Sequence, residues 1–467
     1  MDDIVSKKLQ ELEKKYLEKQ KALKFSFREF VSKKLHIKRS DVFTHNIRSY
    51  PGRLYPYIPI YFLSSDKYCS ATGKVLDPFC GSGTVLLESI VNPYYKRNVY
   101  GVEINPLGRL ISKVKTTPIN PKKLDRKIDY IFKLTKTTKS CSRSKDSIPN
   151  FQNIDLWFSK KAKYGLGQLK ACIELLEDDD CRDFFWVCFS KLVRDVSRAD
   201  PNIPPPVFLK VLKYKDSYRY EKLKALAKRN ENPDTVGIFK RIVNDNSRRI
   251  KHLWEVKEVK YRKVQAEIIW DDSRNIKIGT YSTKGDIDKT DIKPIKNSIS
   301  LIITSPPYLT AQKYVRSTKL ELYWLGMVSG CELNELDRQT IGTERVFLSN
   351  DIQAYGTTIV DNLLTKIGKS SKERMLVTYE YFKNMKQVFK QCFHLLNNNG
   401  FMVLVIGTNK VGNLNVNTAK LLIEIAKKIG FEDVLVLRDE IKGRGMITKR
   451  HDTGGLIKDE YIIILKK

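Results

Sequence analysis

The chain has 467 residues, which suits two or three domains, and its hydrophobic content of 41% is enough for a large core. Its 85 basic and 53 acidic residues give a net charge of +32, an excess that suits a polyanion such as nucleic acid. No stretch approaches the roughly 18 apolar residues of a membrane helix, and the first residues lack a signal-peptide core. We therefore expect a protein with no membrane association.

Cysteine and histidine usage narrows the classes of site further. The eight cysteines include no C-x-x-C pair, which indicates reduced thiols in a cytoplasmic protein. The five histidines show no metal-ligand spacing with cysteines or carboxylates, so we expect no metal site.

The chain begins with a charged segment, residues 1–40, that is typical of a helix. Its apolar side chains Leu9, Leu12 and Tyr16 would share one face of that helix. A packing helix or a dimer contact explains this pattern better than a separate function.

A glycine-rich turn follows an apolar strand predicted over Lys74–Leu76. The strand delivers Asp77 at its carboxyl end, and Gly81 and Gly83 let the backbone turn tightly and lie against a ligand before a helix begins near Thr84. Tight turns of this kind also occur without a ligand, so the turn alone does not define a site.

The next predicted strand, Asn98–Val102, ends in Glu103, about 20 residues after the turn. A carboxylate at that spacing accepts hydrogen bonds from a ribose. No Lys follows the glycines as a P-loop requires, and the run is GSG rather than GxGxxG. The pattern therefore favours a nucleoside ligand without phosphates.

The middle of the chain, Thr116–Tyr261, is rich in basic residues and predicted helices. Seventeen Lys and Arg stand against seven acids in Val207–Lys263, with Tyr and Trp residues among them. Basic side chains interleaved with aromatics suit phosphate contact and base stacking. A Lys-rich solvated face is the other interpretation, but the excess is larger than solubility requires.

A second buried strand, Leu301–Thr304, stops at a Ser-Pro-Pro-Tyr corner. The two prolines fix φ and remove two backbone donors, which leaves the carbonyls of Ser305 and Pro306 as acceptors that the sheet does not use. An exocyclic amine could donate to the Ser305 side chain and to a carbonyl of the corner. Tyr308 offers a flat face for a base.

The C-terminal part predicts the rest of a sheet. Tyr381–Asn409 reads as an amphipathic helix, a turn at Asn397–Gly400 and a buried strand, and Leu421–Gly430 as the next helix. Two β-rich runs, Val434–Arg438 and Tyr461–Leu465, close the chain.

Together, VLDPFCGSGT (Val75–Thr84) and TSPPY (Thr304–Tyr308) resemble the amino-methylating, site-specific DNA methyltransferases. Matches cover His45–Lys115 and Val264–Lys467. The resemblance implies an α/β, Rossmann-like sheet whose last two strands form a reversed hairpin, and S-adenosylmethionine as cofactor. It divides the chain into an N-terminal helix (residues 1–40), a catalytic domain (41–115 plus 262–467) and a largely helical basic insertion (116–261).

The resemblance also implies roles for individual residues. The catalytic corner would be Ser305, Pro306, Pro307 and Tyr308. The acidic residue that faces the adenine amino group of the cofactor would come from AEIIWDDSRN (Ala266–Asn275). By that match it is Asp272, with Asp271 as the second choice. The full predicted cofactor set is Asp77, Phe79, Gly81, Gly83, Glu103, Asp272 and Ser273.

One further segment takes part in the resemblance, and two others are candidates for DNA recognition. His45–Leu63 resembles the motif that closes over the methionine end of the cofactor, although an amphipathic packing segment explains its residues equally well. The insertion Thr116–Tyr261 is the candidate DNA-recognition region, with Met327–Arg374 as its rival. Cys80 reads as a packing residue, and without a Pro-Cys dipeptide the covalent mechanism of cytosine-C5 enzymes has no carrier.

Within the family, Ser-Pro-Pro-Tyr usually goes with N4 of cytosine and Asp-Pro-Pro-Tyr with adenine, so Ser305 favours a flipped cytosine. The expected partner is double-stranded DNA, with a cognate restriction endonuclease as a candidate second partner in a prokaryotic cell. An N6-adenine enzyme, an RNA amino-methyltransferase and an inactive nucleic-acid-binding scaffold remain as alternatives.

Overall fold

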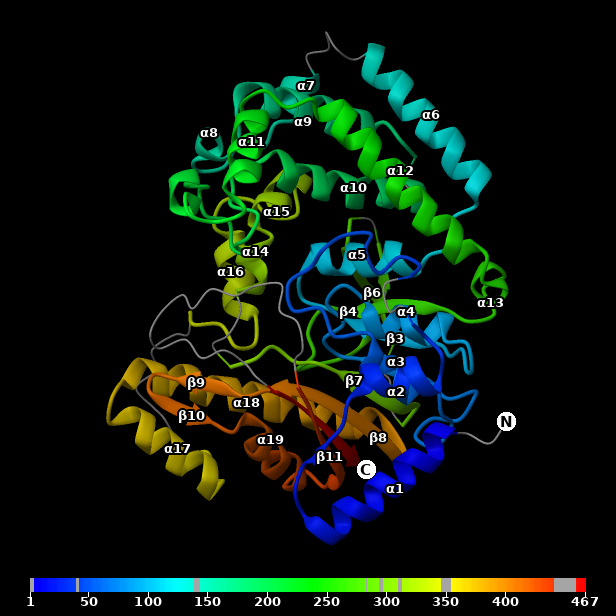
Figure 1. The fold of residues 1–467 in the computed structure, drawn as a ribbon, viewed down its shortest axis with the longest axis vertical. Helices are drawn as coiled ribbons and strands as arrows, with labels where there is room; N and C mark the ends of the chain where they lie inside the picture. Colours follow the sequence, from blue (N-terminus) through cyan, green and yellow to red (C-terminus); the bar gives the residue numbers. More distant parts are fainter. Residues whose placement is uncertain are drawn as a thin grey trace.

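The computed structural model describes residues 4–38, 42–137, 143–177, 179–282, 284–293, 297–309, 313–345, 354–440 and 459–467. A sheet with flanking helices forms one part of the molecule, and a largely helical part stands above it in Figure 1. None of the described helices is both long and apolar enough to cross a membrane.

An eight-stranded sheet organises the fold, in the order β1-β11-β12-β8-β7-β2-β3-β4. Strands β4, β3, β2, β7 and β8 run parallel to one another, whereas β12 lies antiparallel to both β8 and β11. This order confirms the predicted Rossmann-like α/β fold and its reversed terminal hairpin. The strands are β1 (Leu23–Lys24), β2 (Val75–Asp77), β3 (Val99–Val102), β4 (Ala266–Trp270), β7 (Ile299–Thr304), β8 (Leu396–Gly407), β11 (Glu432–Glu440) and β12 (Asp459–Lys466).

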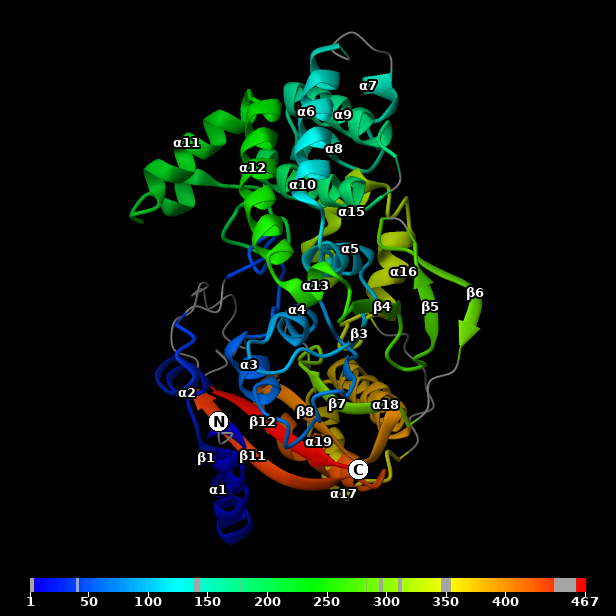
Figure 2. The same cartoon turned by 90° about the vertical axis from the view of Figure 1, so that its right-hand side faces the viewer.

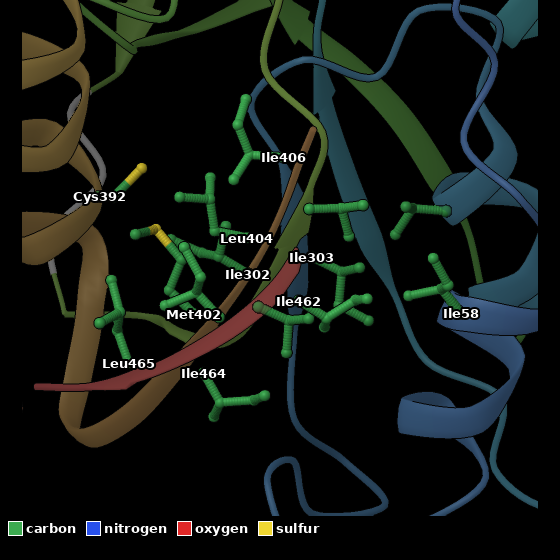
Figure 3. Packing of buried hydrophobic residues seen from close by; sticks show 14 of the residues in the cluster. Ile58, Ile302, Ile303, Cys392, Met402, Leu404, Ile406, Ile462, Ile464 and Leu465 are labelled. Atoms are coloured by element: carbon green, nitrogen blue, oxygen red, sulfur yellow. The ribbon is translucent and has the colours of Figure 1, made fainter. Parts of the chain in front are cut away.

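Both faces of the sheet are covered, which explains the continuous apolar runs of its central strands. In β7, Leu301, Ile302 and Ile303 are fully buried. Figure 3 shows the strand side chains between Cys392 of α18 on one side and Ile58 of α3 on the other. The helices associated with the sheet are α2 (Phe27–Lys34), α3 (Tyr57–Leu63), α4 (Thr84–Val91), α5 (Pro106–Thr116), α17 (Thr358–Gly368), α18 (Lys372–Leu395) and α19 (Thr418–Lys427).

The helical lobe, defined here as α6 to α13, packs around the buried helix α10. Its Phe184, Phe185, Trp186 and Phe189 are fully buried. Figures 1 and 2 show the lobe at one end of the molecule, with α11 standing out from it in Figure 2. The helices are α6 (Pro121–Thr137), α7 (Arg143–Asp146), α8 (Ile154–Trp157), α9 (Lys160–Glu174), α10 (Asp180–Val196), α11 (Tyr220–Glu231), α12 (Thr235–Trp254) and α13 (Lys257–Lys260), with a short 3-10 helix, η2 (Val211–Tyr214), before α11.

Shorter elements connect these two parts. Hairpin β5–β6 follows the sheet strand β4, and helices α14 to α16 follow the Ser-Pro-Pro-Tyr corner. Hairpin β9–β10 follows β8. Their bounds are β5 (Ile278–Tyr281), β6 (Ile287–Lys293), β9 (Asn409–Val411), β10 (Leu414–Val416), α14 (Tyr314–Ser317), α15 (Lys319–Leu325) and α16 (Glu332–Gln339).

The N-terminal helix α1 (Ile4–Lys19) packs through the predicted face, with Leu9, Leu12 and Tyr16 buried. The Tyr16 hydroxyl donates to Asp433 of β11 at 2.9 Å. The chain then adds β1 as a parallel edge strand beside β11. The first segment is thus packed against the end of the sheet.

Two predicted helices have different bounds in the structure, because capping residues set their first turns. Helix α18 begins at Lys372, nine residues before the predicted start at Tyr381, and the side chain of Ser371 accepts from the Arg374 amide. Helix α19 begins at Thr418 because Asn417 caps it.

The predicted turn at Asn397–Gly400 lies inside β8 instead of before it. The pairing with β7 jumps there from Ile299↔Leu396 to Leu301↔Phe401, and Asn399 has a φ of +63°. The turn residues therefore form an irregular bulge within a longer strand.

Candidate active site

The glycine-rich turn lies between β2 and α4, as the sequence predicts. Gly81 and Gly83 have φ values of +53° and +72°, in the left-handed region. A Cβ on Gly83 would come within 2.9 Å of the Ser112 hydroxyl of α5, so glycine is also required by packing. The Ser112 hydroxyl donates to the Gly81 carbonyl at 2.9 Å, which fixes the turn against α5.

Glu103, at the end of β3, reaches the same turn. One carboxylate oxygen accepts from the Gly81 amide at 2.9 Å and the other from the Asn105 amide at 2.9 Å. Burial raises the pKa of Glu103 above its ordinary value, while these amide hydrogen bonds oppose that change. The carboxylate is therefore held rigidly beside the glycine turn.

A cavity opens over these residues at the carboxyl ends of the strands. It collects residues from the glycine turn and from the ends of β3, β4 and β7. Further lining residues come from the segment before α3, from α14, and from the end of α16 and the residues after it. The lining is Tyr50, Pro51, Gly52, Pro78, Phe79, Gly81, Glu103, Ile104, Asn105, Asp271, Asp272, Ser273, Ser305, Pro307, Tyr314, Val315, Gln339, Thr340 and Ile341.

The charge of this cavity is opposite to that of the whole chain. Its lining has three carboxylates, Glu103, Asp271 and Asp272, and within the described part of the chain no Lys, Arg or His lines it. Lys289 pairs with Asp271 at 2.7 Å and Arg274 with Asp272 at 2.9 Å, from outside the lining. The cavity is unsuited to phosphate groups and suited to a neutral or cationic ligand.

Both candidate adenine acids reach the cavity, so its lining does not separate Asp272 from Asp271. The hydroxyl of the next residue, Ser273, donates to the Pro78 carbonyl. That contact joins the end of β4 to the start of the glycine turn.

Asp77 lies beneath the site and is not among the residues that line the cavity. It accepts hydrogen bonds from the Phe79 amide at 3.1 Å and from the Thr304 hydroxyl at 2.7 Å. Burial raises its pKa to about 7 against the effect of these donors. In this position Asp77 joins the end of β2 to the strand that carries the Ser-Pro-Pro-Tyr corner.

The four corner residues divide between the cavity and its supports. Ser305 and Pro307 line the cavity, whereas Pro306 and Tyr308 are not part of the lining. The Tyr308 hydroxyl donates to the Glu460 carboxylate of β12 at 3.1 Å, and burial raises the pKa of Tyr308 well above its ordinary value. The side-chain amide of Asn409 donates to the Leu309 carbonyl at 2.6 Å.

A second hollow shares Tyr314 and Thr340 with the cavity. It also includes Gly342, where a Cβ would lie 3.3 Å from the Tyr308 carbonyl and 3.7 Å from Pro307. This hollow therefore adjoins the corner.

Several lining residues were not predicted individually. Tyr50, Pro51 and Gly52 belong to the segment His45–Leu63, which the sequence singles out only as a whole. The residues at the end of α16 and just after it, Gln339–Ile341, carry no recognisable motif. Asn105 had a local signal, the Asn-Pro pair of a helix start, and its side chain caps α5.

A buried ion pair lies beside the site. The Arg48 guanidinium, two residues before Tyr50, contacts Glu321 of α15 at 2.5 Å, and the Glu321 side chain is 1% exposed. Arg194 of α10 carries a second positive charge toward the same carboxylate. The pair connects the cavity to the helices that follow the corner.

Cys80 is buried under the glycine turn, and burial raises its thiol pKa well above the ordinary value. A thiol in that state suits the packing role. Among the described residues, no group of three or more His, Cys, Asp and Glu side chains could hold a metal ion.

Comparison with known proteins gives a relative that spans the chain. The chain is 26% identical over 450 residues to the type II methyltransferase M.MvaI of Kocuria varians, and the match covers 91% of each protein. A solved structure titled as a putative DNA modification methylase from Thermus thermophilus is 22% identical over 19% of this chain and 36% of that chain, with a TM-score of 0.15. Such a score carries no argument here. No protein-family profile matches the chain.

Proposed function

We propose that this chain is a site-specific DNA methyltransferase that uses S-adenosylmethionine and modifies N4 of a cytosine flipped out of the duplex. The observation that carries the proposal is the acidic cavity, without a basic side chain in its described lining, at the carboxyl ends of the strands of a strongly basic protein. The similarity to a type II methyltransferase along 91% of the chain supports the same class of enzyme.

The lining fits the proposed cofactor in its chemistry. Glu103 offers a carboxylate to a ribose, Asp271 or Asp272 offers one to an adenine amine, and Phe79 offers an apolar contact. S-adenosylmethionine carries no phosphate, and when bound it supplies an electrophilic methyl group on a positively charged sulfur. Gly81 and Gly83 would let the backbone lie close to it.

At the corner, the residues of the chain would orient the acceptor amine. The Ser305 hydroxyl and a carbonyl of the corner accept its two N–H groups, so that the nitrogen lone pair turns out of conjugation toward the cavity. The Tyr308 ring offers a surface for the base after it leaves the stack. The neighbouring hollow at Gly342 adds space beside the corner.

The relative named as a type II methyltransferase supports a role in modification of specific sites. We infer a cognate restriction endonuclease as the biological partner and the bacterial cytoplasm as the location. Double-stranded DNA is the substrate in this proposal, consistent with the net charge of +32.

The test is mass spectrometry of nucleosides from the DNA of a methylation-free host that expresses the chain, paired with modification-sensitive sequencing. We expect N4-methylcytosine at one short sequence. N6-methyladenine would overturn the assignment of the base, and methylation confined to RNA, or no methylation, would overturn the function.

The purified Ser305→Ala variant tests the corner. Because the variant loses a hydroxyl that accepts the amine, we expect kcat to fall about 100-fold while S-adenosylmethionine still binds. The control is Ser298→Ala, on the segment just before β7, which we expect to keep normal activity. Normal kcat in Ser305→Ala would contradict the role of the corner.

A further inference from the structure

One segment of the helical lobe differs from the rest in its surface. Residues 207–231, which include η2 and α11 and which we call the basic arm, contain eight Lys and Arg against three acids. Figure 2 shows α11 standing out from the lobe. The arm therefore offers a basic surface away from the packed core.

In the described part of the chain, the lysines of the arm are free of ion pairs, which is true of only part of the lobe's other lysines. In the rest of the lobe some lysines form ion pairs and others do not: Lys123 pairs with Asp179 at 2.9 Å and Lys127 with Glu177 at 2.8 Å, whereas exposed Lys122 and Lys133 form none among the described residues. Within the described residues, no lysine of the arm forms an ion pair, and all six are exposed, namely Lys210, Lys213, Lys215, Lys222, Lys224 and Lys228.

The arm also exposes large apolar side chains between those lysines. Leu212 is 78% exposed and Tyr218 is 89% exposed, with Val207 and Phe208 above 40%. The Arg219 guanidinium lies 5.1 Å from the centre of the Tyr218 ring. Four large apolar side chains exposed within one short segment of a basic surface favour an interaction site there.

The base of the arm is fixed, so its outer surface is presented rigidly. Asn230 donates to the Ser197 carbonyl at 2.6 Å, and Arg198 donates to Glu231 at 2.7 Å. The Tyr214 hydroxyl donates to Asp200 at 2.6 Å. An element held in this way needs little ordering when it binds a partner.

We propose that the basic arm is a contact surface for duplex DNA, in which its lysines bind phosphates and Leu212 and Tyr218 contact sugars or bases. This inference rests on the proposed function, and it names the part of the chain that holds the substrate. Charge complementarity selects DNA over an apolar protein partner, because the arm carries eight basic residues against three acids and its six lysines are exposed.

The experiment compares two triple variants of the full chain that lose the same charge. One is Lys213→Ala/Lys215→Ala/Lys222→Ala in the arm, and the control is Lys14→Ala/Lys19→Ala/Lys21→Ala, which removes exposed lysines at the N-terminus. The Kd for a synthetic duplex carrying the methylated sequence is measured at several salt concentrations, and S-adenosylmethionine binding is measured in parallel.

We expect the arm variant to bind the duplex more weakly and with a smaller salt dependence. The slope of log Kd against the logarithm of the salt concentration should fall by up to about 0.9 for each phosphate that the variant no longer neutralises. Cofactor binding stays normal in both variants, and the control keeps the affinity of the wild type. Tyr218→Ser, at an exposed position, lowers duplex affinity without changing the salt slope.

Three outcomes overturn the proposal, and they are distinguishable. If the wild-type protein methylates DNA and the arm variants bind DNA normally, the role of the arm is wrong and the proposed function stands. If the arm variant and the control lose the same duplex affinity, the effect comes from net charge and not from the arm. If the wild-type protein neither binds nor methylates DNA, or prefers structured RNA, both the proposed function and the role of the arm are wrong.

Discussion

At the scale of single residues, the candidate site depends on side chains that hold the corner without lining the cavity. Tyr308 is the clearest case, because its hydroxyl is bound to Glu460 on the terminal strand β12 at 3.1 Å. Burial raises the pKa of Glu460, and the hydrogen bond from Tyr308 opposes that change. Glu460 is therefore a positioning residue for the ring that would face the base.

Tyr308→Phe keeps the ring and removes the bond, so we expect kcat to fall about tenfold, corresponding to a hydrogen bond to a charged group of about 1.5 kcal/mol. Glu460→Ala should lower kcat by the same factor. The double variant Tyr308→Phe/Glu460→Ala should lower it no further, because both changes break the same contact. Glu460→Gln keeps an acceptor and should retain most of the activity. Steady-state kinetics with separate kcat and KM values check this.

Asp459→Ala is the control for strand β12, since Asp459 is the neighbouring residue and pairs with Arg438 at 3.1 Å instead. We expect near-normal kcat for this variant. Full activity in Tyr308→Phe, or additive losses in the double variant, would show that the contact does not position the ring.

At the scale of elements, the link between the cavity and the helices after the corner is the Arg48–Glu321 pair at 2.5 Å. Removing one member of a buried pair leaves an uncompensated charge and typically costs about 3–5 kcal/mol. We therefore expect Glu321→Ala to lower the free energy of unfolding by that amount. Because Arg48 precedes the lining residues Tyr50–Gly52, cofactor affinity should fall as well.

Chemical denaturation and calorimetric titration with S-adenosylmethionine measure the two effects. Glu335→Ala, on the exposed face of α16, removes a carboxylate that is not buried and should change neither quantity. Unchanged stability in Glu321→Ala would show that the pair makes no net contribution.

The elements also show what the sequence could predict. Strands β2, β3 and β7 were found within one or two residues, since apolar runs ending in Asp77, Glu103 and Ser305 mark buried parallel strands and their carboxyl ends. The starts of α18 and α19 were missed because single capping residues set them. The lining at Gln339–Ile341 was missed because only tertiary packing brings that segment over the site.

Sequence alone also could not distinguish residues that touch a ligand from those that support the site. Asp77 ends a strand as Glu103 does, yet Glu103 lines the cavity while Asp77 is turned beneath it to meet Thr304. The two acids have the same local pattern, and only the packing of β7 against β2 separates them. The predicted cofactor and catalytic residues therefore stay predictions where no ligand contact tests them.

At the scale of the whole molecule, the helical lobe and the sheet share helices. Helix α5, which follows Glu103, buries Leu107 and Leu110 in the core of the lobe. Helix α15, which follows the corner, buries Leu322 and Trp324 there. The helical lobe is thus packed directly against helices that leave the two halves of the candidate site.

This shared core predicts that the two parts unfold together, although chains of this length often unfold in stages. Leu322→Ala, at a fully buried position of α15, should cost about 2–5 kcal/mol and shift the whole transition. Differential scanning calorimetry, with hydrogen exchange of α10 and of β2 as local reporters, measures this. Leu422→Ala, equally buried in α19 at the sheet end, is the matched variant and should move both reporters as well.

If the two parts were independent, Leu322→Ala would shift the exchange of α10 alone and the calorimetric transition would split. The physical argument against that outcome is that separating the lobe from the sheet would expose the apolar faces of α5 and α15 together. Since α5 fixes the glycine turn through Ser112 and α15 holds Arg48 through Glu321, the same separation would remove supports from both sides of the cavity. The cofactor should therefore protect α10 from exchange when it binds, although α10 does not line the cavity.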